Sequence, residues 1–141
     1  METQDKTTVQ WVQDLIAIHI TRKEAAHRLY AIAGNDSSMA AKMLAAEKQS
    51  QQHLPKLLDE LSSYGDGVAA DADRNNQYML LWNNTLAGID QLLPEDAESI
   101  FKQMEEKLRD IYQGLLEGTA ELPPSFREIL ATQWNQLSAG S

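Results

Sequence analysis

Four long stretches of the chain carry apolar residues at spacings of three and four, which is the spacing along one face of an α-helix. None of them shows the alternation of apolar and polar residues that would indicate a β-strand. The apolar positions are Trp11, Leu15, Ile18, Ala25, Leu29 and Ile32; Met39, Met43, Leu54, Leu57 and Leu61; Ala97, Phe101, Met104, Leu108, Ile111 and Leu115; and Phe126, Ile129, Leu130 and Leu137. Each stripe has to be buried against another element, so the sequence predicts several helices packed together.

Capping and helix-breaking residues indicate where each helix begins and ends. Thr7 or Thr8 can cap the first helix, and Gly34 is suited to end it. The polar residues 35–38 can cap the second helix, and Pro94 with two following acidic residues opens a later one. We therefore expect helices at about 8–33, 37–64, 76–88, 94–117 and 124–138, with G65-D-G67 ending the second.

The lengths of the connectors predict how these helices pair. A short connector joins the first two long helices, and another joins the last two, so each pair should form an antiparallel hairpin. The long crossing between the pairs contains the shorter helix at about 76–88. The expected fold is all-α: one domain over residues 1–141, built as an antiparallel four-helix bundle with an additional short helix in the crossover between helix pairs.

The composition excludes several classes of function. Cysteine is absent, which excludes disulfides, thiolate metal sites and a cysteine nucleophile. The 21 acidic against 12 basic residues give a net charge of -9, which disfavours nucleic acid and anionic membranes as partners. We expect a cytoplasmic protein, because no apolar run approaches the roughly 20 residues that span a bilayer and the start of the chain lacks the pattern of a secretory signal.

Several features occur in a characteristic order between Val12 and Leu137. They are the opening L15-I-A-I18, the long first hairpin, the extra helix with Trp82, and the L122-P-P124 turn before the last helix. In this order the chain resembles a ferritin-like family of bacterial four-helix-bundle proteins of unknown function. For the wider ferritin-like group, the resemblance implies a di-metal site in the bundle core, made by a glutamate from each of two helices and Glu-x-x-His from each of the other two.

The stretch A45-A-E-K-Q-S-Q-Q-H53 is the part of the second helix where such ligands would lie. At about 100° per residue, Glu47, Ser50 and His53 fall on or beside its apolar stripe. Serine then stands where the histidine of Glu-x-x-His belongs, and a hydroxyl is a poor ligand for iron, manganese or zinc. The last helix shows a similar loss, because its core-facing polar pair is Gln133-x-x-Gln136.

Arg22 occupies the centre of the first helix's stripe, where the resemblance implies a bridging glutamate. Arginine is always charged and cannot coordinate a cation. If the first two helices are antiparallel, Arg22 lies level with residues 47–50, so we expect it to contact Glu47. We expect His19 and His53 close to the same level, while Glu105 lies at the edge of the third long helix's stripe and could remain a ligand.

The literal Glu-x-x-His match, Glu24-x-x-His27, lies on the wrong face of its helix. Both residues project roughly 140 to 160° from the stripe that contains Leu15 and Leu29. We therefore expect an exposed pair that supports the helix locally.

Two apolar residues on the first helix require a cover from another element or from a partner. Ile16 and Ile20 project away from the first helix's stripe, so either the Y78-M-L-L-W82 helix or a second subunit should cover them. We expect the short helix of the same chain to cover them; a homodimer or another protein partner is compatible with that cover and is also expected.

The leading interpretation is a non-catalytic, structural or stress-associated interaction protein without a cofactor. Its degenerate metal site would be replaced by a buried polar layer of Arg22, Glu47, Ser50 and Gln133. One alternative is an oxidase or storage-type bundle that binds di-iron, manganese or zinc, with candidate ligands His19, Glu47, His53 and Glu105. Another is a binder of a small apolar ligand in the bundle core near Ser50 and Pro55, where the proline would kink the helix.

Overall fold

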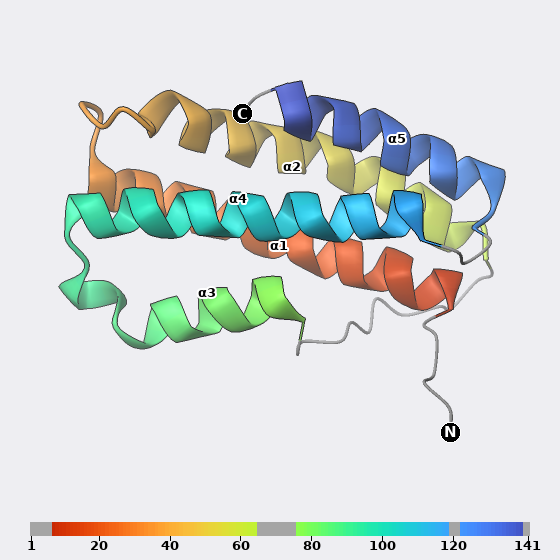
Figure 1. Cartoon of the computed structure of the whole chain (residues 1–141), viewed down its shortest axis with the longest axis horizontal. Coiled ribbons are helices and arrows are strands. Elements are labelled where there is room, and N and C mark those ends of the chain that lie inside the picture. Colours follow the sequence, from red (N-terminus) through yellow and green to blue (C-terminus); the bar gives the residue numbers. More distant parts are fainter. Residues whose placement is uncertain (1–6, 65–75, 119–121, 140–141) are drawn as a thin grey trace.

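The computed structural model describes residues 7–64, 76–118 and 122–139, and this described chain is all-helical, as the sequence predicts (Figure 1). Its elements are α1 (Thr8–Ala33), α2 (Ala40–Ser62), α3 (Gln77–Ala87), the 3-10 helix η1 (Ile89–Gln91), α4 (Pro94–Glu117) and α5 (Pro124–Ala139). The bounds of α1 and α4 coincide with those expected from the sequence. The turn expected at G65-D-G67 lies outside the described residues. Among the helices that the structure describes, none combines the length and apolar character needed to cross a membrane.

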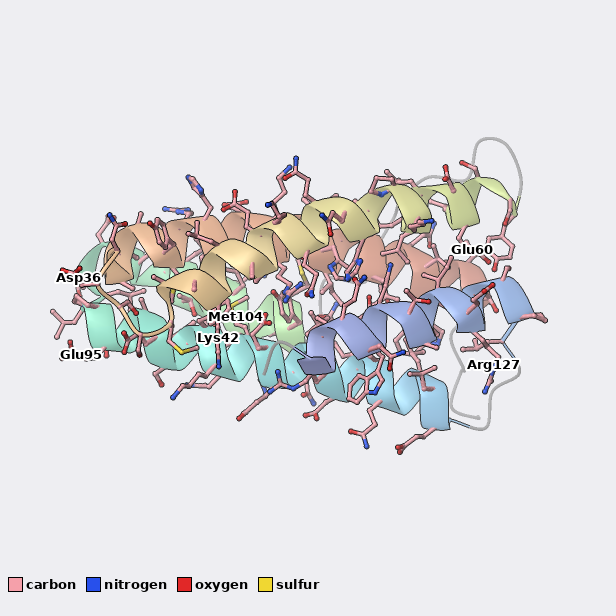
Figure 2. All side chains as sticks on the ribbon, turned by 90° about the horizontal axis from the view of Figure 1, so that it is seen from above. Asp36, Lys42, Glu60, Glu95, Met104 and Arg127 are labelled. Carbon is pink, nitrogen blue, oxygen red and sulfur yellow. The ribbon has the colours of Figure 1, made fainter. Side chains whose placement is uncertain are left out.

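The four long helices lie side by side around one core. α1 packs against α2 and α4, and α5 packs against α4 and α2 (Figures 1 and 2). Neighbouring long helices run in opposite directions, whereas α2 and α4 run in the same direction (Figure 1). The core between them contains Leu15, Leu29, Met43, Leu57, Met104, Leu108, Phe126 and Leu130.

Side-chain hydrogen bonds hold this arrangement at both ends. In the connector between α1 and α2, the hydroxyl of Ser37 donates to Glu98 of α4. At the end of α2, Oε2 of Glu60 accepts from the hydroxyl of Ser125 in the first turn of α5, at 2.9 Å. These contacts tie α2 and its connector to both helices of the second hairpin.

The ends of α1 follow the sequence signals. The backbone N–H of Gln10 donates to Oγ1 of Thr7 at 3.2 Å, and Oε1 of Gln10 accepts from the Thr7 N–H at 2.8 Å, so Thr7 is the cap. Gly34 ends the helix with φ 88 and ψ 164, a conformation that is nearly restricted to glycine.

α2 begins later than the sequence predicted. We expected residues 35–38 to cap a helix from position 37, but α2 begins at Ala40. The reason is that Oγ of Ser37 accepts from the N–H of Met39 at 3.0 Å while the same hydroxyl donates to Glu98. Ser37 therefore shapes the turn and holds α4 instead of capping α2.

α3 covers only part of the outer face of α1. This short helix packs against α1 and α4 through the buried side chains of Tyr78, Met79 and Trp82. Ile16 is buried, while Ile20 is 54% exposed. The intrachain cover expected for these two isoleucines is therefore present at one and absent at the other.

The backbone at Gly34 generates a stability prediction. Gly34→Ala should lower the free energy of unfolding by about 1 to 3 kcal/mol, because the residue would be forced into a sparsely populated conformation. Gly88→Ala is the matched control, since Gly88 also ends a helix but has φ -125 and open space around an added Cβ. Urea unfolding of both variants measures the difference, and equal stabilities would contradict the role given to Gly34.

Candidate functional site

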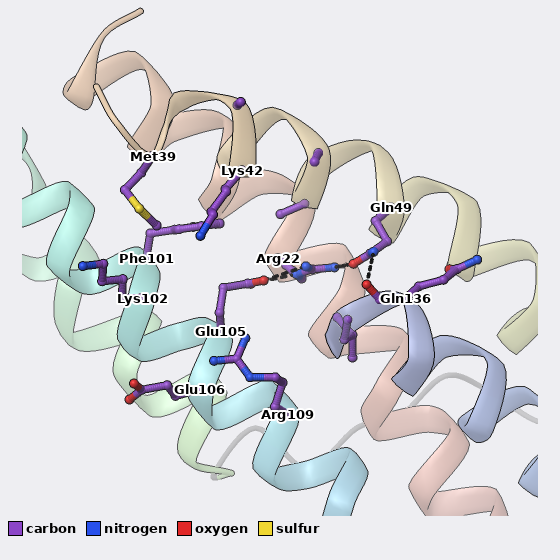
Figure 3. Close-up of a pocket in the computed structure, with 14 residues that line it drawn as sticks. Arg22, Met39, Lys42, Gln49, Phe101, Lys102, Glu105, Glu106, Arg109 and Gln136 are labelled. Carbon is purple, nitrogen blue, oxygen red and sulfur yellow. Dashed lines mark hydrogen bonds and ion pairs between the residues drawn. The ribbon is translucent and has the colours of Figure 1, made fainter. Parts of the chain in front are cut away.

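Arg22 lies at the centre of the packed helices, with only 3% of its side chain exposed. Its Nε and Nη2 donate to the two carboxylate oxygens of Glu105 on α4, at 2.9 and 2.7 Å (Figure 3). Its Nη1 donates to Oε1 of Gln49 at 2.9 Å and to Oγ of Ser50 at 3.1 Å, both on α2. Gln49 in turn donates to the backbone carbonyl of Gln136 on α5, at 3.2 Å. Arg22 therefore connects all four long helices.

Glu105 neutralises the charge of Arg22. An unpaired charge in this position would cost several kcal/mol. Burial by itself lowers the pKa of Arg22, but the charge of Glu105 and its hydrogen bonds outweigh this effect and raise the pKa. Because both carboxylate oxygens are engaged and Glu105 is only 16% exposed, the two residues form a fixed ion pair with bidentate geometry.

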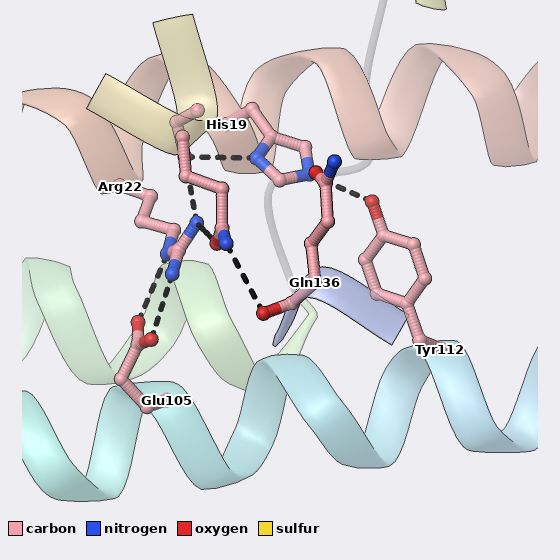
Figure 4. A network of polar contacts seen from close by, with 7 residues as sticks. His19, Arg22, Glu105, Tyr112 and Gln136 are labelled. Atoms are coloured by element: carbon pink, nitrogen blue, oxygen red, sulfur yellow. Dashed lines mark hydrogen bonds and ion pairs between the residues drawn. The ribbon is translucent and has the colours of Figure 1, made fainter. Parts of the chain in front are cut away.

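A line of hydrogen bonds runs from Arg22 through Ser50 to His19 (Figure 4). Arginine can only donate, so the Ser50 hydroxyl accepts from Nη1 and keeps its own hydrogen to donate onward. Oγ of Ser50 lies 2.9 Å from Nδ1 of His19, which accepts that hydrogen. The hydroxyl of Tyr112 donates to Gln133 and therefore accepts from His19, which places the proton of His19 on Nε2.

The line continues from His19 to Tyr112 and Gln133. Nε2 of His19 lies 2.7 Å from the Tyr112 hydroxyl and donates to it. The hydroxyl donates to Oε1 of Gln133 on α5, at 2.5 Å. Burial raises the pKa of Tyr112, so its hydroxyl stays protonated and keeps this donor role. The hydrogen bonds that run from Arg22 through Ser50, His19 and Tyr112 to Gln133 thus share one direction. We call this series the polar line.

The two buried histidines are neutral. Burial lowers the pKa of His19 well below its ordinary value, and the charge of Arg22 and neighbouring His53 lower it further. Burial and the charge of Arg22 lower the pKa of His53 to about 4. The histidine rings lie 5.2 Å apart, edge to face, in agreement with the common level expected from the sequence. A proton on either ring would add a second positive charge beside Arg22.

Two buried nitrogen atoms, Nε2 of His53 and Nε2 of Gln133, have no hydrogen-bond partner within the described residues. The Gln133 atom is a donor, because Oε1 of the same amide is used by Tyr112. Both residues line a groove of about 410 Å³ between α2 and α5. Its other lining residues are Gln52, Lys56, Glu128, Ile129, Thr132 and Gln136. A hydroxyl or carboxylate oxygen placed between the two nitrogens would satisfy the buried donor.

The candidate metal ligands do not converge. Across residues 7–64, 76–118 and 122–139, no three histidine, aspartate or glutamate side chains are placed to hold a metal ion. The nitrogens of His19 are engaged by Ser50 and Tyr112, and the oxygens of Glu105 by Arg22. Coordination by these residues would require the polar line to be broken.

The predicted contact between Arg22 and Glu47 is wrong. Glu47 is 28% exposed, and its Oε1 lies 3.4 Å from Nδ1 of His27. Because α1 and α2 are antiparallel, a residue three positions before Ser50 lies further along α1, beyond Arg22. Glu47 is therefore outside the buried polar layer. The level predicted for Arg22 is nevertheless confirmed by its contacts with Gln49 and Ser50.

The exposure predicted for the Glu24-x-x-His27 and Gln133-x-x-Gln136 pairs is only partly correct. Glu24 and His27 are exposed as predicted, but Glu24 pairs with Arg28 at 3.7 Å and His27 faces Glu47. The predicted inward pair Gln133 and Gln136 is wrong for its second member, because Gln133 is buried and Gln136 is exposed. Three residues advance a helix by about 300°, which leaves Gln136 about 60° off the buried direction.

Tyr112 is the main residue that the sequence interpretation missed. The predicted stripe of α4 included Ile111, but Tyr112 is fully buried and Ile111 only partly. Tyr112 follows Leu108 by four residues and precedes Leu115 by three, so its spacing matched the stripe. A buried tyrosine requires a partner for its hydroxyl, and His19 was a candidate on the neighbouring helix.

Ser50 and His19 also have the separation of a nucleophile and its base. Both side chains are fully buried, and Oγ of Ser50 is engaged by Arg22. A substrate cannot reach Ser50 in this arrangement, so the pair is structural.

No family model, no curated protein and no solved structure matches this chain. The interpretation of the site therefore depends on its own geometry.

The ion pair gives a stability prediction. Arg22→Leu should lower the free energy of unfolding by roughly 3 kcal/mol, because Glu105 loses its partner, and Glu105→Leu should cost a similar amount. Arg22→Leu with Glu105→Leu should cost less than the sum of the single changes. Denaturant unfolding measures each value. Glu47→Leu is the control and should change stability by less than about 1 kcal/mol; an Arg22→Leu effect of the same size would contradict the buried pair.

The lowered pKa of His53 gives a pH prediction. Between about 6.5 and 4, the unfolded chain binds a proton that the folded chain does not, so protonation favours unfolding. Stability should fall as the pH is lowered through this range, by at most roughly 1.4 kcal/mol per pH unit for each such histidine. His53→Gln should reduce the slope. An unchanged slope in His53→Gln would rule out this contribution.

Proposed function

We propose that this chain is a ferritin-like four-helix bundle in which a buried ion pair takes the place of the metal centre, and that it acts without catalysing a reaction. The observation that carries the proposal is the bidentate contact of Arg22 with Glu105. Guanidinium has no lone pair to offer a metal, and its charge repels a cation. Glu105, the carboxylate best placed to be a ligand, already has both oxygens engaged.

The order and direction of the helices support the ferritin-like assignment. α1 with α2, and α4 with α5, form antiparallel pairs, while α2 and α4 run in the same direction (Figure 1). The segment between α2 and α4 therefore has to return along the length of the bundle, and it contains α3. One long crossover between two hairpins is the connection typical of ferritin-like bundles.

Exposed apolar side chains support an action through protein contacts. Ile20, Leu44, Leu58, Leu80 and Leu93 are each exposed by 45% or more. Exposed apolar side chains that lie together are buried when a protein meets a partner or a second copy of itself. The net charge of -9 makes nucleic acid an unfavourable partner. We therefore propose a structural or stress-associated interaction protein that works as a homodimer or with another protein.

The proposal is tested by metal content. Protein purified without chelator is exposed to iron, manganese or zinc, desalted, and analysed by elemental mass spectrometry. We expect well below one ion per chain, because Ser50 and Tyr112 engage the nitrogens of His19 and Arg22 engages both oxygens of Glu105. One or two ions per chain, lost in Glu105→Gln but retained in Glu47→Gln, would overturn the proposal and establish a working metal site.

A further inference from the structure

A second hollow lies beside the ion pair, between α2, α4 and the end of α5 (Figure 3). It has a volume of about 370 Å³, within the range of small-molecule sites. Its charge differs from that of the whole chain. Arg22, Lys42, Lys102 and Arg109 line it against only two acidic residues, whereas the chain has 12 basic and 21 acidic residues. We call this hollow the cationic pocket.

The cationic pocket keeps a net positive charge that is available to a ligand. Arg22 and Glu105 neutralise each other. Lys42, Lys102 and Arg109 form no ion pair within the part of the chain that the structure describes, and Glu106 offsets only one of them. A concave site lined by unpaired cations concentrates anions.

The buried arginine adds a positioned donor. Four of the five N–H groups that a guanidinium carries are used by Glu105, Gln49 and Ser50. The remaining one belongs to a side chain that lines the pocket and is 3% exposed. An anionic oxygen that reached it would accept a charge-assisted hydrogen bond in a place largely screened from water.

The base of the pocket is apolar. Met39, Phe101 and Leu137 are buried side chains that line it. Ala41, Ala45 and Ala46 line the side formed by α2, and their small size leaves the space open. Apolar surface beside unpaired cations suits a molecule with an apolar body and an anionic head.

We propose that the cationic pocket binds a small amphipathic anion, a carboxylate or sulfonate with an apolar body. Lys42, Lys102 and Arg109 surround the head, and Met39, Phe101 and Leu137 contact the body. The inference does not depend on the proposed loss of metal binding, because Lys42, Lys102 and Arg109 take no part in the polar line.

The test is calorimetric titration of the full chain with decanoate below its micelle-forming concentration. We expect saturable binding of one decanoate per chain that weakens as salt is raised. Decyltrimethylammonium, which has the same apolar chain and the opposite charge, should bind at least about tenfold more weakly. Equal binding of the two compounds would overturn the proposal, as would the absence of decanoate binding.

Two kinds of variant locate the site. The double variant Lys42→Gln with Arg109→Gln should weaken decanoate binding about tenfold. The control, Lys23→Gln with Lys48→Gln, removes the same charge from exposed residues outside the pocket and should have little effect.

Ala45→Trp should block binding by filling the hollow without loss of helix content, because Ala45 is exposed as well as lining the pocket. Undiminished binding in Ala45→Trp would place decanoate elsewhere. If decanoate does not bind but the same substitution dissociates a dimer, the pocket is an interface between copies and the proposal is wrong.

Discussion

A permanent positive charge in the middle of four helices is the constraint on which the interior of this protein depends. Arg22 cannot lose its proton, so folding has to supply it with an anion and with acceptors for its N–H groups. Glu105 supplies the anion from α4, and Gln49 and Ser50 supply acceptors from α2. These partners come from two helices, α2 and α4, so the charge can be accommodated only when both are packed against α1 in this register.

The groups at the two ends of the polar line fix the direction of every hydrogen bond between them. Arg22 can only donate at one end and Oε1 of Gln133 can only accept at the other, so Ser50, His19 and Tyr112 each accept on one side and donate on the other. This order also decides which atom of Gln133 is left over, namely the amide nitrogen at the groove between α2 and α5. An apolar core could hold the helices together without such selectivity. We therefore regard the polar line as a device that specifies one arrangement of the helices, at some cost in stability.

The sequence predicted elements well and contacts between elements less well. The positions of Thr7, Gly34 and Pro94 were sufficient for the bounds of α1 and the start of α4, because caps and breakers act within one turn. The antiparallel register of α1 and α2 placed Arg22 level with Ser50 correctly. It could not choose between Glu47 and Glu105, because a projection gives the face of one helix and not which neighbour that face meets. The start of α2 was misplaced for a similar reason, since Ser37 is engaged by Glu98 from a distant part of the chain.

The charge of Arg22 has consequences for the two histidines. A di-metal centre would use imidazole as a neutral ligand and hold it by coordination. Here the histidines are also neutral, but the cause is burial together with the charge of Arg22, which makes a second positive charge unfavourable. Burial and Arg22 thus keep both rings in the neutral form, which is also the form in which imidazole would bind a metal. Because Glu105 balances that arginine, the field in the cationic pocket comes mainly from Lys42, Lys102 and Arg109. Substitutions at these three residues should therefore change the charge of the pocket without disturbing the ion pair.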